Sequence, residues 1–236
     1  MTVNFEYLKT SLRYAIPYIP VTLKLAIFSF IAGLILGAIF GAVRFYKIPV
    51  LSKVTAVFVT VYMGLPLIVA LMLYNIIFLV YYPVVAEALH FRTEISQVNT
   101  IVIGYFALTL YAACNASEVV RSAFMSVETV QFEAGYSIGL TKLQTLRKVI
   151  LPQMIPVMVP GLTNQMVGML KATNLVSAIS VTEVMLGAVM PCNQTYSFLE
   201  GYIAAALIYW AINLVLEWIA RRIESRSGKF RKAPAV

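Results

Sequence analysis

Residues 130–140 read Val-Gln-Phe-Glu-Ala-Gly-Tyr-Ser-Ile-Gly-Leu, and residues 150–153 read Ile-Leu-Pro-Gln. The first stretch is a polar island between long apolar segments. Its composition predicts a short structured helix instead of a plain connecting loop. A helix in this position favours a surface that docks onto a partner.

Composition places the chain among integral membrane proteins. Hydrophobic residues make up 61% of its 236 residues and charged residues only 12%, far from the usage of soluble domains. A membrane-spanning helix needs about 20 apolar residues. The apolar runs lie at 16–43, 54–80, 98–117, 149–170 and 201–220. We therefore predict an all-α membrane protein with five transmembrane helices.

Basic residues predict the orientation, because cytoplasmic loops carry an excess of Lys and Arg. One alternate set of connecting segments holds most of the 18 basic residues: Arg44, Lys47, Lys53, Arg121, Lys142, Arg147, Lys148 and those after Ala220. The opposite set holds Lys9, Arg13, Arg92 and Lys171. We expect the N-terminus outside, the C-terminus inside and the polar island in the cytoplasm.

The net charge of +8 fits contact with anionic inner-leaflet lipid and requires no nucleic acid. His90 is the single histidine, and Cys114 and Cys192 are far apart in sequence, so we expect neither a metal site nor catalytic residues.

The first apolar run is too long for a removable signal peptide and carries Lys24. We expect it to stay as a span.

The chain divides into three parts. Residues 1–14 have apolar residues spaced as on one helix face, which suits either an interfacial helix on the outer surface or a frayed terminus. Residues 15–222 form the transmembrane domain, with its main cytoplasmic loop at about 122–148. Residues 223–236 form a basic cytoplasmic tail.

Glycine and proline positions predict how the spans are shaped. Gly33, Gly37 and Gly41 repeat every four residues, which lets another helix approach closely. Gly64 and Pro66 interrupt the second run, either as a packing kink or as a break that lines a substrate path.

The polar island has the signals of two helices joined by a glycine turn. Thr129 is placed to cap the first helix, with Glu133 near its early turns, and Gly139 is placed to end it in the left-handed conformation. Thr141 and Gln144 have capping-box spacing and start a second helix. Small residues at 134 and 135 leave the backbone approachable by a partner.

Two further polar groupings lie at span ends. Glu118 and Arg121 are three residues apart and are expected to form an ion pair at the cytoplasmic boundary. The tract 172–190 is too polar for a regular span, and it contains Glu183. We interpret it as short broken helices facing the protein interior, with an outer loop on the membrane surface as the alternative.

A series of short motifs runs in order from about residue 18 to the end of the chain. They are residues 131–135 with Gly139, residues 150–153, Thr22-Leu23, Gly64-Leu65-Pro66-Leu67, Glu118-Val119-Val120-Arg121, Pro160-Gly161-Leu162-Thr163-Asn164 and Lys171-Ala172-Thr173-Asn174-Leu175. Together they resemble the permease subunits of type I ATP-binding-cassette (ABC) importers, in particular the polar amino-acid branch. Each motif alone is weak, but their order and spacing are specific.

The resemblance implies a bacterial inner-membrane transport subunit that is not itself an enzyme. Its partners would be a dimer of ATP-binding subunits, a second permease subunit and an external substrate-binding protein. ATP and Mg would be used by the ATPase, and this chain would bind no cofactor. The loop would form the coupling helix, with these residues meeting the ATPase: Gln131, Glu133, Ala134, Gly135 and Gly139.

We further expect a substrate path lined by Met63, Asn164, Lys171, Thr173 and Asn174. Members of the family commonly have Arg at the position of Met63 and Asp at that of Ala172. Losing the acid removes a partner for a cationic side chain, which favours a neutral, zwitterionic or sulfur-containing amino acid. The alternative function is a stand-alone ion-coupled carrier, for which Lys24, Glu183 and Glu200 are the candidate ionisable residues.

Overall fold

The computed structural model describes residues 3–90 and 98–227, and all regular structure in these ranges is helical. The helices are α1 Phe5–Ala15, α2 Ile19–Phe45, α3 Leu51–Gly64, α4 Leu67–Ala88, α5 Ile101–Met125, α6 Thr129–Ser137, α7 Lys142–Thr145, α8 Leu151–Ala172, α9 Val184–Val189, α10 Cys192–Thr195 and α11 Phe198–Ser227. Two 3₁₀ turns, Ile16–Tyr18 and Thr173–Ile179, and a π-helical segment, Leu146–Ile150, connect some of them.

Four helical segments of the described ranges are long and apolar enough to cross a membrane: residues 5–45, α4, α5 and α11. A fifth span results if the pair 142–179 and 184–195, bent by 59°, is counted as one. The predicted all-α membrane class with up to five spans is therefore confirmed.

The two ends of the chain are helical where they are described. α1 continues through Ile16–Tyr18 into α2 and packs against α9 and α11. Its buried residues are Ser11 and Ala15. At the other end α11 extends to Ser227, so the first residues of the predicted basic tail are helical. The rest of that tail lies outside the described residues.

The second apolar run is two helices. α3 ends at Gly64, and Leu65 has an extended backbone (φ −89°, ψ 131°) before α4 begins at Leu67. Pro66 explains the break, because proline lacks an N–H group and disfavours helical geometry in the residue before it. At 14 residues α3 is shorter than a full span, so the prediction of one span over 54–80 is wrong in this detail.

α2 packs most extensively against α5. An added Cβ at Gly33 would lie 2.3 Å from the Cβ of Ala112, and one at Gly37 would lie 2.6 Å from the carbonyl oxygen of Ala113. These distances confirm the close approach predicted from the glycine spacing.

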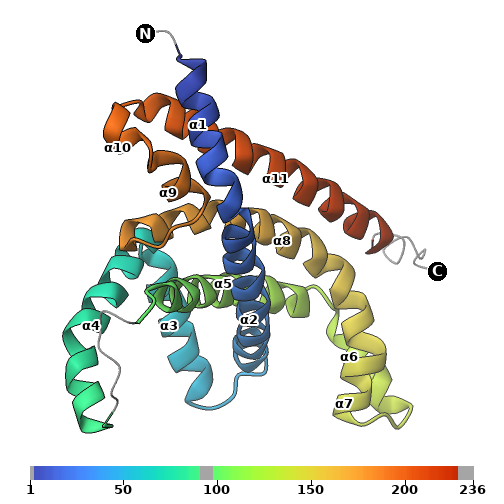
Figure 1. Cartoon of the computed structure of the whole chain (residues 1–236). Coiled ribbons are helices and arrows are strands. Elements are labelled where there is room, and N and C mark those ends of the chain that lie inside the picture. The colour runs from blue at the N-terminus through green and yellow to red at the C-terminus, as the bar shows by residue number, and fades with distance from the viewer. Residues whose placement is uncertain (1–2, 91–97, 228–236) are drawn as a thin grey trace.

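The tract after α8 folds into the protein interior. It consists of the Thr173–Ile179 turn, α9 and α10, with Val176, Val184 and Ala188 fully buried. This confirms short broken helices and contradicts the surface-loop alternative. α9 and α10 lie beside α1 and the start of α11, while α6 and α7 project at the far end of α8 (Figure 1).

Candidate functional site

The first candidate site is the docking turn, which we define as residues 129–145. α6 ends where Gly139 adopts φ +82°, a left-handed conformation that glycine takes without strain. Thr141 and Gln144 then form the complete predicted capping box at the start of α7. Thr129, predicted as the first cap, lies inside α6. Glu128 occupies the cap position and makes no side-chain cap bond.

The tip of the docking turn is exposed and partly apolar. Glu133 and Ala134 are exposed, as predicted for residues that meet a partner. The side chains of Ile138 and Leu143 are about three-quarters exposed, at 75% and 73%, and the sequence analysis did not single them out. Exposed large apolar residues at the end of a polar projection are typical of a contact surface.

Gly135 has a different role from the predicted one. It is buried, and an added Cβ would lie 2.5 Å from Cγ2 of Thr145. Its small size lets α6 pack onto α7, so its backbone is not open to a partner. The amide of Leu140 donates to the carbonyl of Gly135 at 3.1 Å and closes the turn.

Aromatic stacking joins the docking turn to the membrane helices. The Phe132 ring centroid lies 6.0 Å from that of Phe45 in α2, and Phe45 stacks on Phe124 of α5 at 4.6 Å. Nε2 of Gln153 also donates to Oε1 of Gln131 at 3.2 Å. The predicted residue Gln131 therefore ties α6 to α8.

An ion-pair cluster lies near the end of α5. The guanidinium of Arg121 donates to the Glu118 carboxylate at 3.1 Å, as predicted. Arg44 of α2 also reaches Glu118, at 2.5 Å, and its side chain is only 12% exposed. Sequence spacing gave no sign of this second pair, because the partners are 74 residues apart.

The second candidate site is a polar cleft of about 350 Å³ between α5 and α8. Asn115, Glu118, Asn164 and Gln165 contribute its polar side chains. Nε2 of Gln165 donates to the carbonyl of Ala112 at 2.7 Å, while its buried Oε1 has no partner among the described residues. The cleft thus contains one unpaired acceptor and two further amides, beside a carboxylate that Arg44 and Arg121 already pair with.

Only one of the five predicted path residues lines this cleft, namely Asn164. Met63 is exposed on α3 and Lys171 is exposed near the end of α8. The Thr173 hydroxyl is fully buried and donates to the carbonyl of Leu170 at 2.7 Å. Asn174 is half-buried in the following turn. The described cleft residues instead add Gln165 and Asn115, which no motif had marked.

Glu183 forms a buried polar knot, a term we use for this residue with Thr22 and Tyr209. It is 0% exposed and accepts hydrogen bonds from the Thr22 hydroxyl at 3.2 Å and from the Tyr209 hydroxyl. It also accepts from the amide of Met185 at 2.8 Å, which caps α9. These hydrogen bonds are enough to explain why the Glu183 carboxyl group is buried, and its burial requires no role in transport.

Fold and sites together define a multi-pass helical membrane protein with a polar cleft between spans and an exposed docking turn. The chain belongs to the family described as binding-protein-dependent transport system inner membrane component, whose model matches residues 33–229. It is therefore a permease subunit of an amino-acid ABC importer, located in the bacterial inner membrane.

Individual relatives agree with this assignment. The chain is 32% identical over 229 residues to a probable amino-acid ABC transporter permease, PatM of Vibrio harveyi, with 97% of this chain and 98% of the relative covered. It is 36% identical to the L-cystine transport system permease TcyB of Bacillus subtilis, with 89% and 84% covered. A crystal structure of an amino acid ABC transporter with histidines matches at 27% identity and a TM-score of 0.78, covering 96% of this chain and 100% of the other.

Family membership favours the importer over the stand-alone carrier. Permease subunits of this family are not enzymes, and ATP hydrolysis belongs to a separate subunit. Such a permease works with ATPase subunits, a substrate-binding protein and a second permease subunit. Glu183, one of the ionisable residues considered for a carrier, is used in the buried polar knot.

Proposed function

We propose that the docking turn is the coupling element of this importer and that it seats in a groove of the ATPase dimer. The orientation follows from the distribution of basic residues, with the N-terminus outside and the docking turn and C-terminus in the cytoplasm. ATP and Mg are then used by the ATPase, and this chain binds no cofactor. An external binding protein delivers the amino acid to the opposite face.

The observation that supports this assignment is the exposure of Ile138 and Leu143 at the tip, beside the exposed carboxylate of Glu133. The apolar pair suits a hydrophobic groove and the acid suits basic groups at its rim. Movement of the ATPase would pass through Phe132 to Phe45 and Phe124, which belong to α2 and α5. Gly139 keeps the turn at the required angle.

Co-purification of the complex tests the proposal. Ile138→Asp with Leu143→Asp should weaken retention of the ATPase at least tenfold, since both side chains lose burial at the centre of a contact. Glu133→Arg should also reduce retention. Ile48→Asp is the matched control, because Ile48 is an exposed apolar residue in the connection between α2 and α3. Undiminished ATPase binding and ATP-dependent uptake in the double variant would contradict the assignment.

We also propose that the polar cleft is part of the substrate path. The free acceptor of Gln165 suits the ammonium group of an amino acid, and the amide of Asn164 suits its carboxylate. The Glu118 carboxylate at the edge of the cleft is already paired with Arg44 and Arg121. Asn174, Lys171 and Met63 would line the path beyond the cleft. Ala172 in place of an acid favours a neutral, zwitterionic or sulfur-containing amino acid.

Uptake kinetics test the path. Asn164→Leu should raise the KM for uptake, whereas Asn193→Leu, a change at an exposed residue of α10, should leave it unchanged. Equal kinetics in the two variants would remove Asn164 from the path. A screen of amino acids against the external binding protein identifies the substrate class, and selective binding of lysine or arginine would overturn our assignment.

A further inference from the structure

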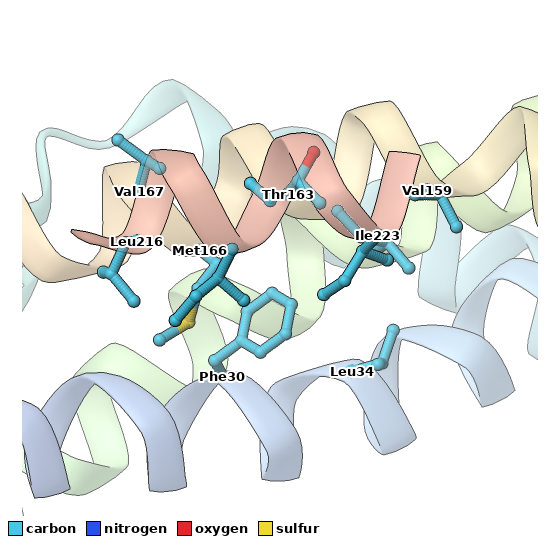
Figure 2. A pocket seen from close by; sticks show the side chains of 11 residues that line it. Phe30, Leu34, Val159, Thr163, Met166, Val167, Leu216 and Ile223 are labelled. Carbon is cyan, nitrogen blue, oxygen red and sulfur yellow. The ribbon is translucent and has the colours of Figure 1, made fainter. Parts of the chain in front are cut away.

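A groove of about 240 Å³ lies between α2, α8 and α11 and is almost entirely apolar. Phe30 and Leu34 enter it from α2, Met166 from α8, and Leu216 and Ile223 from α11. Figure 2 shows these side chains projecting into the space between the three helices, with Val159 and Ile223 at one end and Val167 and Leu216 at the other. The groove is therefore elongated along the helices.

The polar atoms of the groove wall are already used. The hydroxyl of Thr163 donates to the Glu224 carboxylate and lies 3.0 Å from the carbonyl oxygen of Pro160. An occupant of the groove therefore finds no hydrogen-bonding partner there, and an unbranched apolar chain suits it best.

Two arginines lie next to Ile223 along α11, Arg222 directly before it and Arg226 three residues after it. Arg222 lies over the ring of Trp218 at 4.4 Å from its centroid, and Arg226 follows one turn later. Both are exposed. Arg221 is partly neutralised by Glu217 at 3.5 Å, while Arg222 and Arg226 form no ion pair among the described residues. A tryptophan beside arginines at the end of a span is typical of the headgroup level of a membrane.

We propose that the groove, with Arg222 and Arg226, is a binding site for an anionic phospholipid. One acyl chain occupies the groove, and the phosphate of the headgroup lies beside the two guanidinium groups. Basic sites between spans on the cytoplasmic side are suited to anionic headgroups. The site goes beyond the transport function, and the proposed orientation decides only that the lipid comes from the inner leaflet.

Native mass spectrometry of the detergent-solubilised complex tests this site. The purified permease with its ATPase subunits is mixed with phosphatidylglycerol or with phosphatidylcholine carrying the same acyl chains. We expect preferential retention of phosphatidylglycerol. Arg222→Gln with Arg226→Gln should lower this retention by roughly fivefold for each charge removed, and Arg13→Gln, on α1, should not change it. An unchanged preference in the double variant would overturn the proposal.

Filling the groove provides the second test. Ala220→Phe places a ring in the groove and should reduce retention of both lipids, while Ala211→Phe, at an exposed position of the same helix outside the groove, should not. Size-exclusion chromatography shows whether each complex stays assembled. The arginine variants change only exposed side chains and so do not depend on core packing. Loss of permease pairing in Ala220→Phe with unchanged lipid retention would assign the groove to a second copy of the chain and overturn the proposal.

Discussion

The docking turn and the buried polar knot each contain a side-chain cap at a helix start, Thr141 at α7 and Glu183 at α9, yet the residues that each brings together are separated by very different distances along the chain. In the docking turn the capping box joins residues three apart, and the Gln131–Gln153 bond spans 22 residues. In the knot, Glu183 and Thr22 are 161 residues apart. The exposed turn is thus specified locally, while the buried knot exists only once the spans are packed. Substitutions in the knot should therefore lower the free energy of unfolding more than substitutions in the docking turn.

Removing the acceptor of the knot should have the largest effect. Glu183→Leu leaves the hydroxyls of Thr22 and Tyr209 and the capping amides of α9 without an acceptor in a buried place. We expect a loss of about 3–5 kcal/mol in the free energy of unfolding. Thermal unfolding in detergent measures it. Glu217→Leu, which removes a pair on the exposed face of α11, should cost much less, and equal losses would contradict a special role for the knot.

The next largest loss of stability is expected at the glycine contact between α2 and α5. This contact joins residues that are far apart in the chain, although the glycine spacing itself is visible in the sequence. Gly33→Ala and Gly37→Ala place a Cβ within 2.6 Å of α5 atoms. Each should cost about 1–3 kcal/mol through overpacking. Gly64→Ala meets no atom within 4 Å and is the control in the same unfolding experiment. Unchanged stability of both variants would mean that the two helices separate easily.

A smaller effect is expected in the docking turn. Gly139→Ala forces a left-handed conformation on a residue with a Cβ, at a cost of about 1–2 kcal/mol that is confined to the turn. Hydrogen exchange of the α6 and α7 amides should rise, while that of α2 and α5 should stay the same. Gly139→Asn should be milder, since asparagine tolerates this conformation. Faster exchange throughout the spans would show that the turn and the body are not separable.

The ion-pair cluster should give the smallest effect and the finest distinction. Arg121→Gln removes a pair that is partly exposed and should change unfolding by less than about 1 kcal/mol. Arg44→Gln removes a guanidinium that is largely buried between α2 and α5, so it should cost more. Comparing the two variants by thermal unfolding at low and high salt separates them, because salt screens the exposed pair more strongly. A larger loss for Arg121→Gln would reverse this ranking.

The local features of the structure could be predicted from the sequence. Gly139, the Thr141–Gln144 box and the Pro66 break follow from backbone chemistry within a few residues, and glycine spacing predicted a close helix contact. Arg44 as a partner of Glu118 and Gln165 as a cleft residue were missed. Both depend on which faces of distant helices meet, and a single sequence contains no periodic signal for that.

Gly135 and Thr129 show a subtler limit. Both residues were placed correctly within a helix-turn-helix. A difference of one position along the chain, however, decides which residue caps the helix and which residue faces outward. Glu128, not Thr129, is the N-cap residue of α6. Gly135 faces α7, not a partner. Capping and small-residue signals thus indicate that a turn exists more reliably than which side chain faces outward.

The near contact of the α2 and α5 backbones restricts how this transporter changes shape. Three glycines on successive turns of α2, Gly33, Gly37 and Gly41, lie against α5 so closely that the two helices cannot slide past each other without steric overlap. We therefore expect them to travel as one rigid unit during a transport cycle. We expect the hinges elsewhere, at Leu65-Pro66 between α3 and α4 and at the π-helical residues 146–150 that join the docking turn to α8.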